Sequence, residues 1–204
     1  MAFSERTVLA GTMAVALWLG PAQPAGAQDE RLPMRIVVYD YARVPPDVLA
    51  QAKTVVSRVF REIGVDAAWM DVAGFTREMP SENAARQAFV HSVVQVNVIS
   101  PDMHKMLGRK NSVLGGAGSH TRRVWIAFAR IQQAARLAQA DVSDVLGYVI
   151  AHEIGHVLMP AGQHALTGLM QHGVDSNLIA HNRLSFLAGE ARLIRATLAG
   201  RAAR

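Results

Sequence analysis

The sequence predicts a single α+β domain, and two observations carry this prediction. Runs of β-branched and aromatic residues alternate along the chain with stretches in which apolar residues follow helical spacing. The 204 residues are 50% hydrophobic and only 18% charged, which allows one core of ordinary size and argues against large-scale disorder. No internal repeat or low-complexity linker divides the chain.

Four segments are predicted as strands of one twisted sheet because they are rich in β-branched and aromatic residues. In the third of them Val94, Val96 and Val98 alternate with polar residues. The polar segment 76–87 is predicted as a loop, and the glycine-containing segment 113–123 as a turn or bulge. The four predicted strands are residues 34–42, 65–72, 89–100 and 124–131.

Three helices are predicted from the period of their apolar residues. Residues 47–64 form a long helix that backs the sheet, and residues 143–159 form a second helix with Ser143 or Asp141 as its N-cap. An amphipathic helix is expected over residues 183–199. Its buried stripe is predicted to contain Leu187, Leu193, Ile194 and Leu198.

The N-terminus has the pattern of a cleaved signal peptide. A charged start precedes the apolar run 8–20, and Ala25 and Ala27 fit a small-residue cleavage site. The apolar run is too short for a membrane span, which needs about 20 residues. We therefore expect a signal peptide at 1–27, a single domain at 28–204, a periplasmic or secreted location and no membrane anchor after cleavage.

Composition narrows the function classes further. The chain has no cysteine, so disulfides and thiolate chemistry are excluded. Its formal charge is +5, but the basic residues are scattered and no aromatic residues lie between them as in a nucleic-acid platform. We expect a monomer that does not bind nucleic acid.

The stretch "HEIGH" carries the strongest chemical signal. On a helix His152 and His156 project from the same face one turn apart, so their imidazoles can bind one metal ion. Glu153 is rotated by about 100° from His152, which places it beside the ion, where a general base for a metal-bound water belongs. Zinc suits this site because it accepts imidazole ligands in tetrahedral geometry.

A third protein ligand must follow the helix, and His164 is the leading candidate. Pro160 ends the helix and Gly162 allows the chain to turn back towards the metal. The fourth position would then be left to water, as in catalytic zinc sites. Three other residues stay open as alternatives for the third ligand: His172, Asp175 and Glu190.

The other histidines have no ligand spacing and are expected to be structural or solvated. They are His91, His104, His120 and His181. Tyr148 lies one turn before His152 on a similar face, and packing is its expected role.

"HEIGH", a third histidine after a glycine-containing turn, and "TGLM" together resemble the metzincin metallopeptidases, especially matrixin-like members. The chain is also similar to small secreted bacterial zincin-like proteins. The resemblance implies that Met170 is the Met-turn methionine beneath the metal ligands, and that 124–131 is the antiparallel edge strand that binds extended substrate. The third histidine follows the second by eight residues instead of the family's six, and Met159 stands where the family has glycine.

The resemblance implies a metzincin-like α+β fold: a mainly four-stranded sheet with a backing helix, an active-site helix and a C-terminal helix. The implied function is that of a secreted zinc-dependent endopeptidase with one catalytic zinc ion. Glu153 would activate the metal-bound water for attack on the carbonyl of a peptide or protein substrate. The alternative is a secreted non-catalytic binding or structural module on a zincin fold, to which Glu153 would be of no use.

Overall fold

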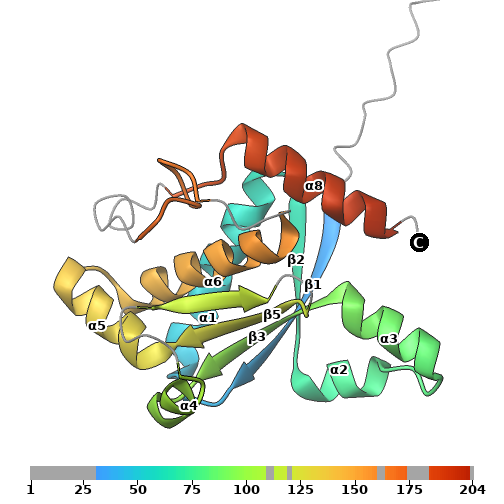
Figure 1. Ribbon diagram of the computed structural model, residues 1–204, viewed down its shortest axis with the longest axis horizontal. Helices are drawn as coiled ribbons and strands as arrows, with labels where there is room; N and C mark the ends of the chain where they lie inside the picture. Colours follow the sequence, from blue (N-terminus) through green and yellow to red (C-terminus); the bar gives the residue numbers. More distant parts are fainter. Residues whose placement is uncertain (1–30, 109–112, 119–120, 160–163, 174–183, 203–204) are drawn as a thin grey trace, which may run out of the picture.

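The computed structural model describes five segments of the chain (Figure 1). They are residues 31–108, 113–118, 121–159, 164–173 and 184–202. The predicted signal peptide at 1–27 lies outside the described residues, so that assignment stays a prediction. None of the described helices combines the length and the apolar character needed to cross a membrane.

A mixed sheet of five strands forms the centre of the fold, in the order β2-β1-β3-β5-β4 (Figure 1). The first four strands in that order are parallel, and β4 pairs antiparallel with β5 at the edge. The predicted α+β class is therefore confirmed, with five strands in place of four. The strands are β1 (Leu32–Asp40), β2 (Val65–Met70), β3 (Val93–Ile99), β4 (Gly115–Gly118) and β5 (Arg123–Ala127).

Helices cover both faces of this sheet. The described helices are α1 (Pro46–Glu62), α2 (Val72–Glu78), α3 (Asn83–Ser92), α4 (Pro101–Met106), α5 (Phe128–Ala138), α6 (Val142–Leu158) and α8 (Ala188–Ala202). The main core lies between the sheet and the helices α1, α6 and α8, and contains Ile36 of β1. Val37, the next residue, points to the other face, where it packs with Phe75 of α2 in a smaller hydrophobic cluster.

Helices α1 and α6 pack closely because α6 has a glycine at their crossing. A Cβ atom at Gly147 would lie 2.6 Å from the Cβ of Val55 and 2.9 Å from the carbonyl oxygen of Ala52. Any larger residue would separate the helices. This contact fixes the long axis of α6 against α1, and through it the residues of α6 that follow.

Two strand predictions extend by a full turn into a neighbouring helix. Residues 89–92, predicted as the start of a strand, are the last turn of α3, where Phe89 packs against the smaller cluster. Residues 128–131, predicted as the end of another strand, begin α5. Apolar residues continue across both boundaries, so hydrophobicity alone does not mark the change from strand to helix.

The predicted edge strand was also misplaced. The strand within 124–131 is β5, which is paired on both sides, by β3 and by β4. The antiparallel edge is β4, in the glycine-rich segment predicted as a turn or bulge. Glycine has low β propensity, so a strand of three glycines and one alanine gives little signal in the sequence.

The other predicted segments agree in part. The predicted polar loop 76–87 instead contains the end of α2 and the start of α3. The C-terminal helix α8 begins at Ala188, later than predicted, and buries Ile194 and Leu198 as predicted. Leu193 is 47% exposed, and Leu187, which precedes α8, is 43% exposed. These two leucines therefore lie outside the buried stripe.

Candidate metal centre

Helix α6 holds the first two histidines in a rigid setting. Asp141 is its N-cap, and its carboxylate accepts a hydrogen bond from the backbone N–H of Ser143 at 2.7 Å. Most of the helix is buried between α1 and the sheet. His152 and His156 lie on the last two turns of α6, so the packing of the whole helix sets their positions.

Three imidazoles converge on one point. The Nε2 atom of His156 lies 3.0 Å from Nε2 of His152 and 3.2 Å from Nε2 of His164. Two nitrogens bound to one tetrahedral zinc ion at the usual distance of 2.0–2.1 Å lie about 3.3 Å apart. Neutral imidazoles that bring their lone pairs this close need a proton or a cation between them. These three histidines therefore form a group that can bind a metal ion.

One hydrogen bond selects the tautomer of His152. Its Nδ1–H donates to the carbonyl oxygen of Leu169 at 2.8 Å, which leaves Nε2 unprotonated and free to bind a metal. Burial lowers the pKa of this imidazole, and the nearby His164 lowers it further. Nδ1 of His156 is buried without a hydrogen-bond partner in the described part of the chain, so packing alone orients that ring.

The other two imidazoles are also kept neutral. Burial lowers the pKa of His156 to about 4, and its closeness to His152 and His164 acts in the same direction. Burial, and then the neighbouring His172, lower the pKa of His164. Because a metal binds the neutral form of imidazole, these lower pKa values favour metal binding at neutral pH.

The turn after His164 is pinned to α6. The N–H of Ala165 donates to the carbonyl of Met170 at 2.8 Å, and Gly168 supplies the left-handed backbone conformation, with φ +80°. Met170 is fully buried. Its Sδ would lie only 2.6 Å from a Cβ at Gly155, so the methionine packs directly against the helix. The structure thus places Met170 in a tight turn against α6. Its contact on α6 is Gly155, the residue before His156.

Glu153 lies beside the histidines and not among the three grouped ligands. Its side chain is buried, with 7% exposure, and faces the edge strand β4. A Cβ at Gly115 would be 3.0 Å from both Cγ and Oε1 of Glu153. Gly115 therefore leaves the space that this carboxylate occupies. The sequence marked the glycines of residues 113–123 only as a turn or bulge, and the contact of Gly115 with Glu153 was not predicted.

Two of the three alternative third ligands, Glu190 and His172, are described and do not join the group. Glu190 accepts a hydrogen bond from the N–H of Leu187 at 2.7 Å at the start of α8, and burial raises its pKa. The ring centroid of His172 lies 4.8 Å from that of His164, but His172 is not part of the three-histidine group. Asp175 lies outside the described residues.

Tyr148 and two of the four histidines expected to be structural or solvated lie in the described part of the chain. Tyr148 is buried, and its hydroxyl accepts a hydrogen bond from Arg58 at 2.7 Å, which agrees with a packing role. Burial raises its pKa. His91 is exposed and His104 is buried, whereas His120 and His181 lie outside the described residues.

Comparison with known proteins identifies this architecture. No protein-family model matches the chain, and no curated protein matches it by sequence. Among solved structures, a zinc-dependent peptidase from Methanocorpusculum labreanum aligns with a TM-score of 0.51 at 15% identity, over 80% of this chain and 99% of that one. The chain has the fold of a zinc-dependent peptidase.

Two archaemetzincin structures align less well. The one from Methanopyrus kandleri has a TM-score of 0.47 and 14% identity, over 86% of this chain and 98% of that one. The one from Archaeoglobus fulgidus, complexed with malonate, has a TM-score of 0.47 and 17% identity, over 79% of this chain and 100% of that one.

Proposed function

We propose that the protein is a zinc-dependent peptidase that cuts peptide bonds within polypeptide chains. The observation that carries the proposal is the convergence of three imidazole Nε2 atoms at the end of α6, the helix that also carries the buried Glu153. Its occurrence in the fold of a zinc-dependent peptidase agrees with this proposal. A metal site that only stabilises a fold has no need of such a carboxylate.

The protein groups have separate roles in this proposal. His152, His156 and His164 would hold the zinc ion through Nε2. When bound, zinc acts as a Lewis acid that polarises a carbonyl and lowers the pKa of water. Glu153 would accept a proton from the attacking water and donate it to the nitrogen of the departing amine. The proton is thus returned as the peptide bond breaks.

The proposed path for the substrate is the open edge of β4. The path predicted along residues 124–131 has no free strand edge, because β5 is already paired on both sides. In the described part of the chain, β4 ends the sheet and keeps one edge free of strand pairing. An extended peptide can add to such an edge by main-chain hydrogen bonds. Gly115 would place that peptide next to Glu153.

Secretion and cleavage of the signal peptide are part of the same proposal. They rest on the charged, apolar and small-residue pattern of residues 1–27. Mass spectrometry of the exported protein should give a mature N-terminus near Gln28.

The Glu153→Gln variant provides the main test. The amide has nearly the shape of the carboxylate, so zinc content should stay near that of the wild type. It cannot accept a proton, so cleavage of an unbiased peptide library should fall by at least about 100-fold, the usual contribution of a general base. His164→Ala is the matched variant, and it should lose most of its zinc because it removes a ligand.

Two outcomes would contradict the proposal. If fully metallated wild-type protein cleaves nothing in a broad library, the non-catalytic module is the better description. If Glu153→Gln cleaves as fast as the wild type, the activity belongs to a contaminant or to another base.

A further inference from the structure

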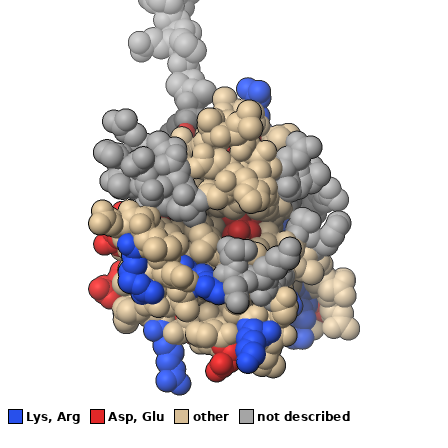
Figure 2. Space-filling view, turned by 60° about the vertical axis from the view of Figure 1, so that its left-hand side comes forward, with Lys and Arg blue, Asp and Glu red and all other residues tan. Residues whose placement is uncertain are grey.

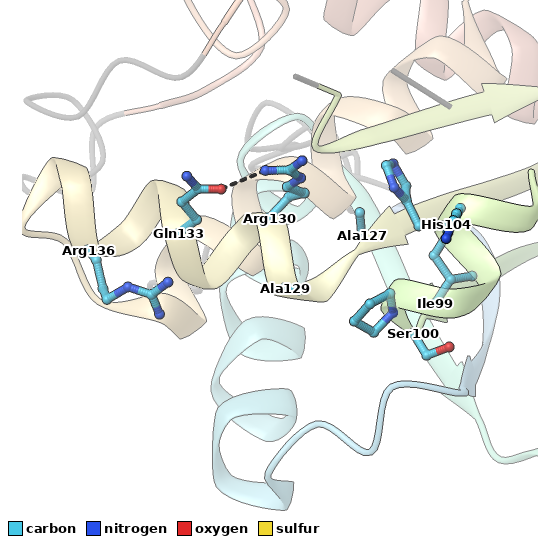
Figure 3. Close-up of a pocket in the computed structure, with 10 residues that line it drawn as sticks. Ile99, Ser100, His104, Ala127, Ala129, Arg130, Gln133 and Arg136 are labelled. Carbon is cyan, nitrogen blue, oxygen red and sulfur yellow. Dashed lines mark hydrogen bonds between the residues drawn. The ribbon is translucent and has the colours of Figure 1, made fainter. Parts of the chain in front are cut away.

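A cavity of about 490 Å³ lies away from the three histidines, at the carboxyl ends of two parallel strands (Figure 3). Ile99 and Ala127, the last residues of β3 and β5, form its floor, and residues of α4 and α5 form its walls. The carboxyl ends of parallel strands are where α/β sheets commonly bind ligands. The volume is within the usual range for small-molecule sites.

One buried polar atom at this cavity lacks a partner. His104 of α4 is 9% exposed, and its Nε2 makes no hydrogen bond to any described residue. In the close-up, the side chains of His104 and Arg130 lie on either side of Ala127 (Figure 3). Buried polar atoms are almost always hydrogen-bonded, so this Nε2 needs a partner that the described residues do not supply.

The charges around the cavity select an anion. Lys105, Arg130 and Arg136 line it together with His104, and none of the described lining residues is acidic. Arg130 is held by a hydrogen bond to Gln133 at 2.7 Å. On the face that carries α5, Lys and Arg side chains spread across the lower half, with some Asp and Glu side chains between them (Figure 2).

The start of α5 adds to this positive character. Its N-cap is Ala127, which offers no side chain to the free N–H groups of the first turn, and that turn contains no acidic residue. Unpaired N–H groups at a helix N-terminus and the helix dipole favour an anion. Ala127, Ala129 and Arg130 of this turn all line the cavity.

We propose that the cavity between α4 and α5 binds a small organic phosphate ester, with the phosphate held by His104, Lys105, Arg130 and the first turn of α5. Two or three cationic groups and a helix N-terminus suit a doubly charged oxyanion. The cavity is larger than a bare phosphate ion, which leaves room for the organic part. This site is separate from the proposed zinc site and does not depend on peptidase activity.

The test uses calorimetric titration of the full-length mature protein with inorganic phosphate and with glycerol 3-phosphate. We expect one molecule bound per chain, with the ester at least as tight as phosphate. Arg130→Gln and Lys105→Gln should each weaken binding by about tenfold or more, because each removes a charged hydrogen-bond donor. The imidazole signal of His104 in the wild-type NMR spectrum should shift on titration, which needs no substitution at this buried position.

Two control variants separate this site from other phosphate-binding positions. Arg61→Gln removes an exposed cation at the end of α1 and should leave the affinity unchanged. His164→Ala removes a proposed zinc ligand and should also leave the affinity unchanged, whereas binding would be lost if zinc held the phosphate. The proposal is overturned if no stoichiometric binding occurs, or if Arg61→Gln or His164→Ala weakens binding as much as Arg130→Gln. It is also overturned if succinate, a dicarboxylate without phosphate, binds more tightly than the ester.

Discussion

Replacing Gly147 by alanine should destabilise the protein, although alanine is the better helix former. An exposed Gly→Ala change inside a helix gains about 0.5–1 kcal/mol. At Gly147 the new methyl group would lie 2.6 Å from Val55 Cβ and 2.9 Å from the carbonyl oxygen of Ala52. Neither atom can swing aside as the end of a flexible side chain could. Overpacking of this kind costs about 1–3 kcal/mol.

We expect the clash at Gly147 to lie at the upper end of that range, so the net loss should be about 1–2 kcal/mol. For a chain of this size this corresponds to a fall in the melting temperature of about 2–8 °C. Gly189 in the first turn of α8 is the matched control, because its nearest neighbour to a new Cβ is Arg192 at 4.0 Å. Gly189→Ala should leave stability unchanged or raise it by up to about 1 kcal/mol.

Urea unfolding of both variants at constant zinc loading gives the comparison. The reasoning fails if Gly147→Ala is as stable as the wild type, since α1 and α6 would then have room that the structure does not show. It also fails if Gly189→Ala loses as much stability as Gly147→Ala, because the loss would then come from the substitution itself and not from the helix crossing.

Three further predictions concern the candidate site. Gly115→Ala should displace the Glu153 carboxylate by a few tenths of an ångström and lower kcat by about tenfold with zinc retained; an unchanged kcat would show that this contact does not position the base. Met170→Ala should lower the free energy of unfolding by about 2–5 kcal/mol through the cavity it leaves, and a smaller loss by urea unfolding would contradict the tight packing of the turn. The pKa of His156 is about 4 in the folded protein and about 6.5 in the unfolded chain. Between these two values the unfolded state binds more protons, so the zinc-free protein should lose stability as the pH falls from about 6.5 to about 4. His156→Gln should show a smaller loss over this window, and an equal loss would assign the effect to other groups.

The sequence predicted what depends on local spacing. His152, Glu153 and His156 are placed by the period of one helix, and that helix begins at Asp141, one of its two predicted caps. His164 could be proposed because a proline and a glycine precede it, and the structure brings its Nε2 to the other two. The roles of these residues stay predictions until a metal and an activity are measured.

Other features depend on contacts between distant segments and left no local signal. The pairing of β4 with β5 is invisible in the glycines of β4, and the choice between strand and helix at Phe89 and Phe128 is set by what each packs against. The unpaired Nε2 of His104 becomes informative only once α4 and α5 lie together. Glu190 could be set aside as a ligand only when its hydrogen bond to Leu187 was seen.

The composition of β4 has a consequence for where a bound peptide would be cut. Side chains normally fix the register of a strand against its neighbour, because a slip by one residue exchanges the two faces. β4 contains Gly115, Gly116, Ala117 and Gly118, so it offers a paired chain almost no side chains that would oppose slipping. A peptide on this edge could be held firmly by its main chain and still slide. Contacts to the peptide's side chains outside β4 would then decide which bond is presented to Glu153. A substrate that lacks such contacts should be cut at several neighbouring bonds.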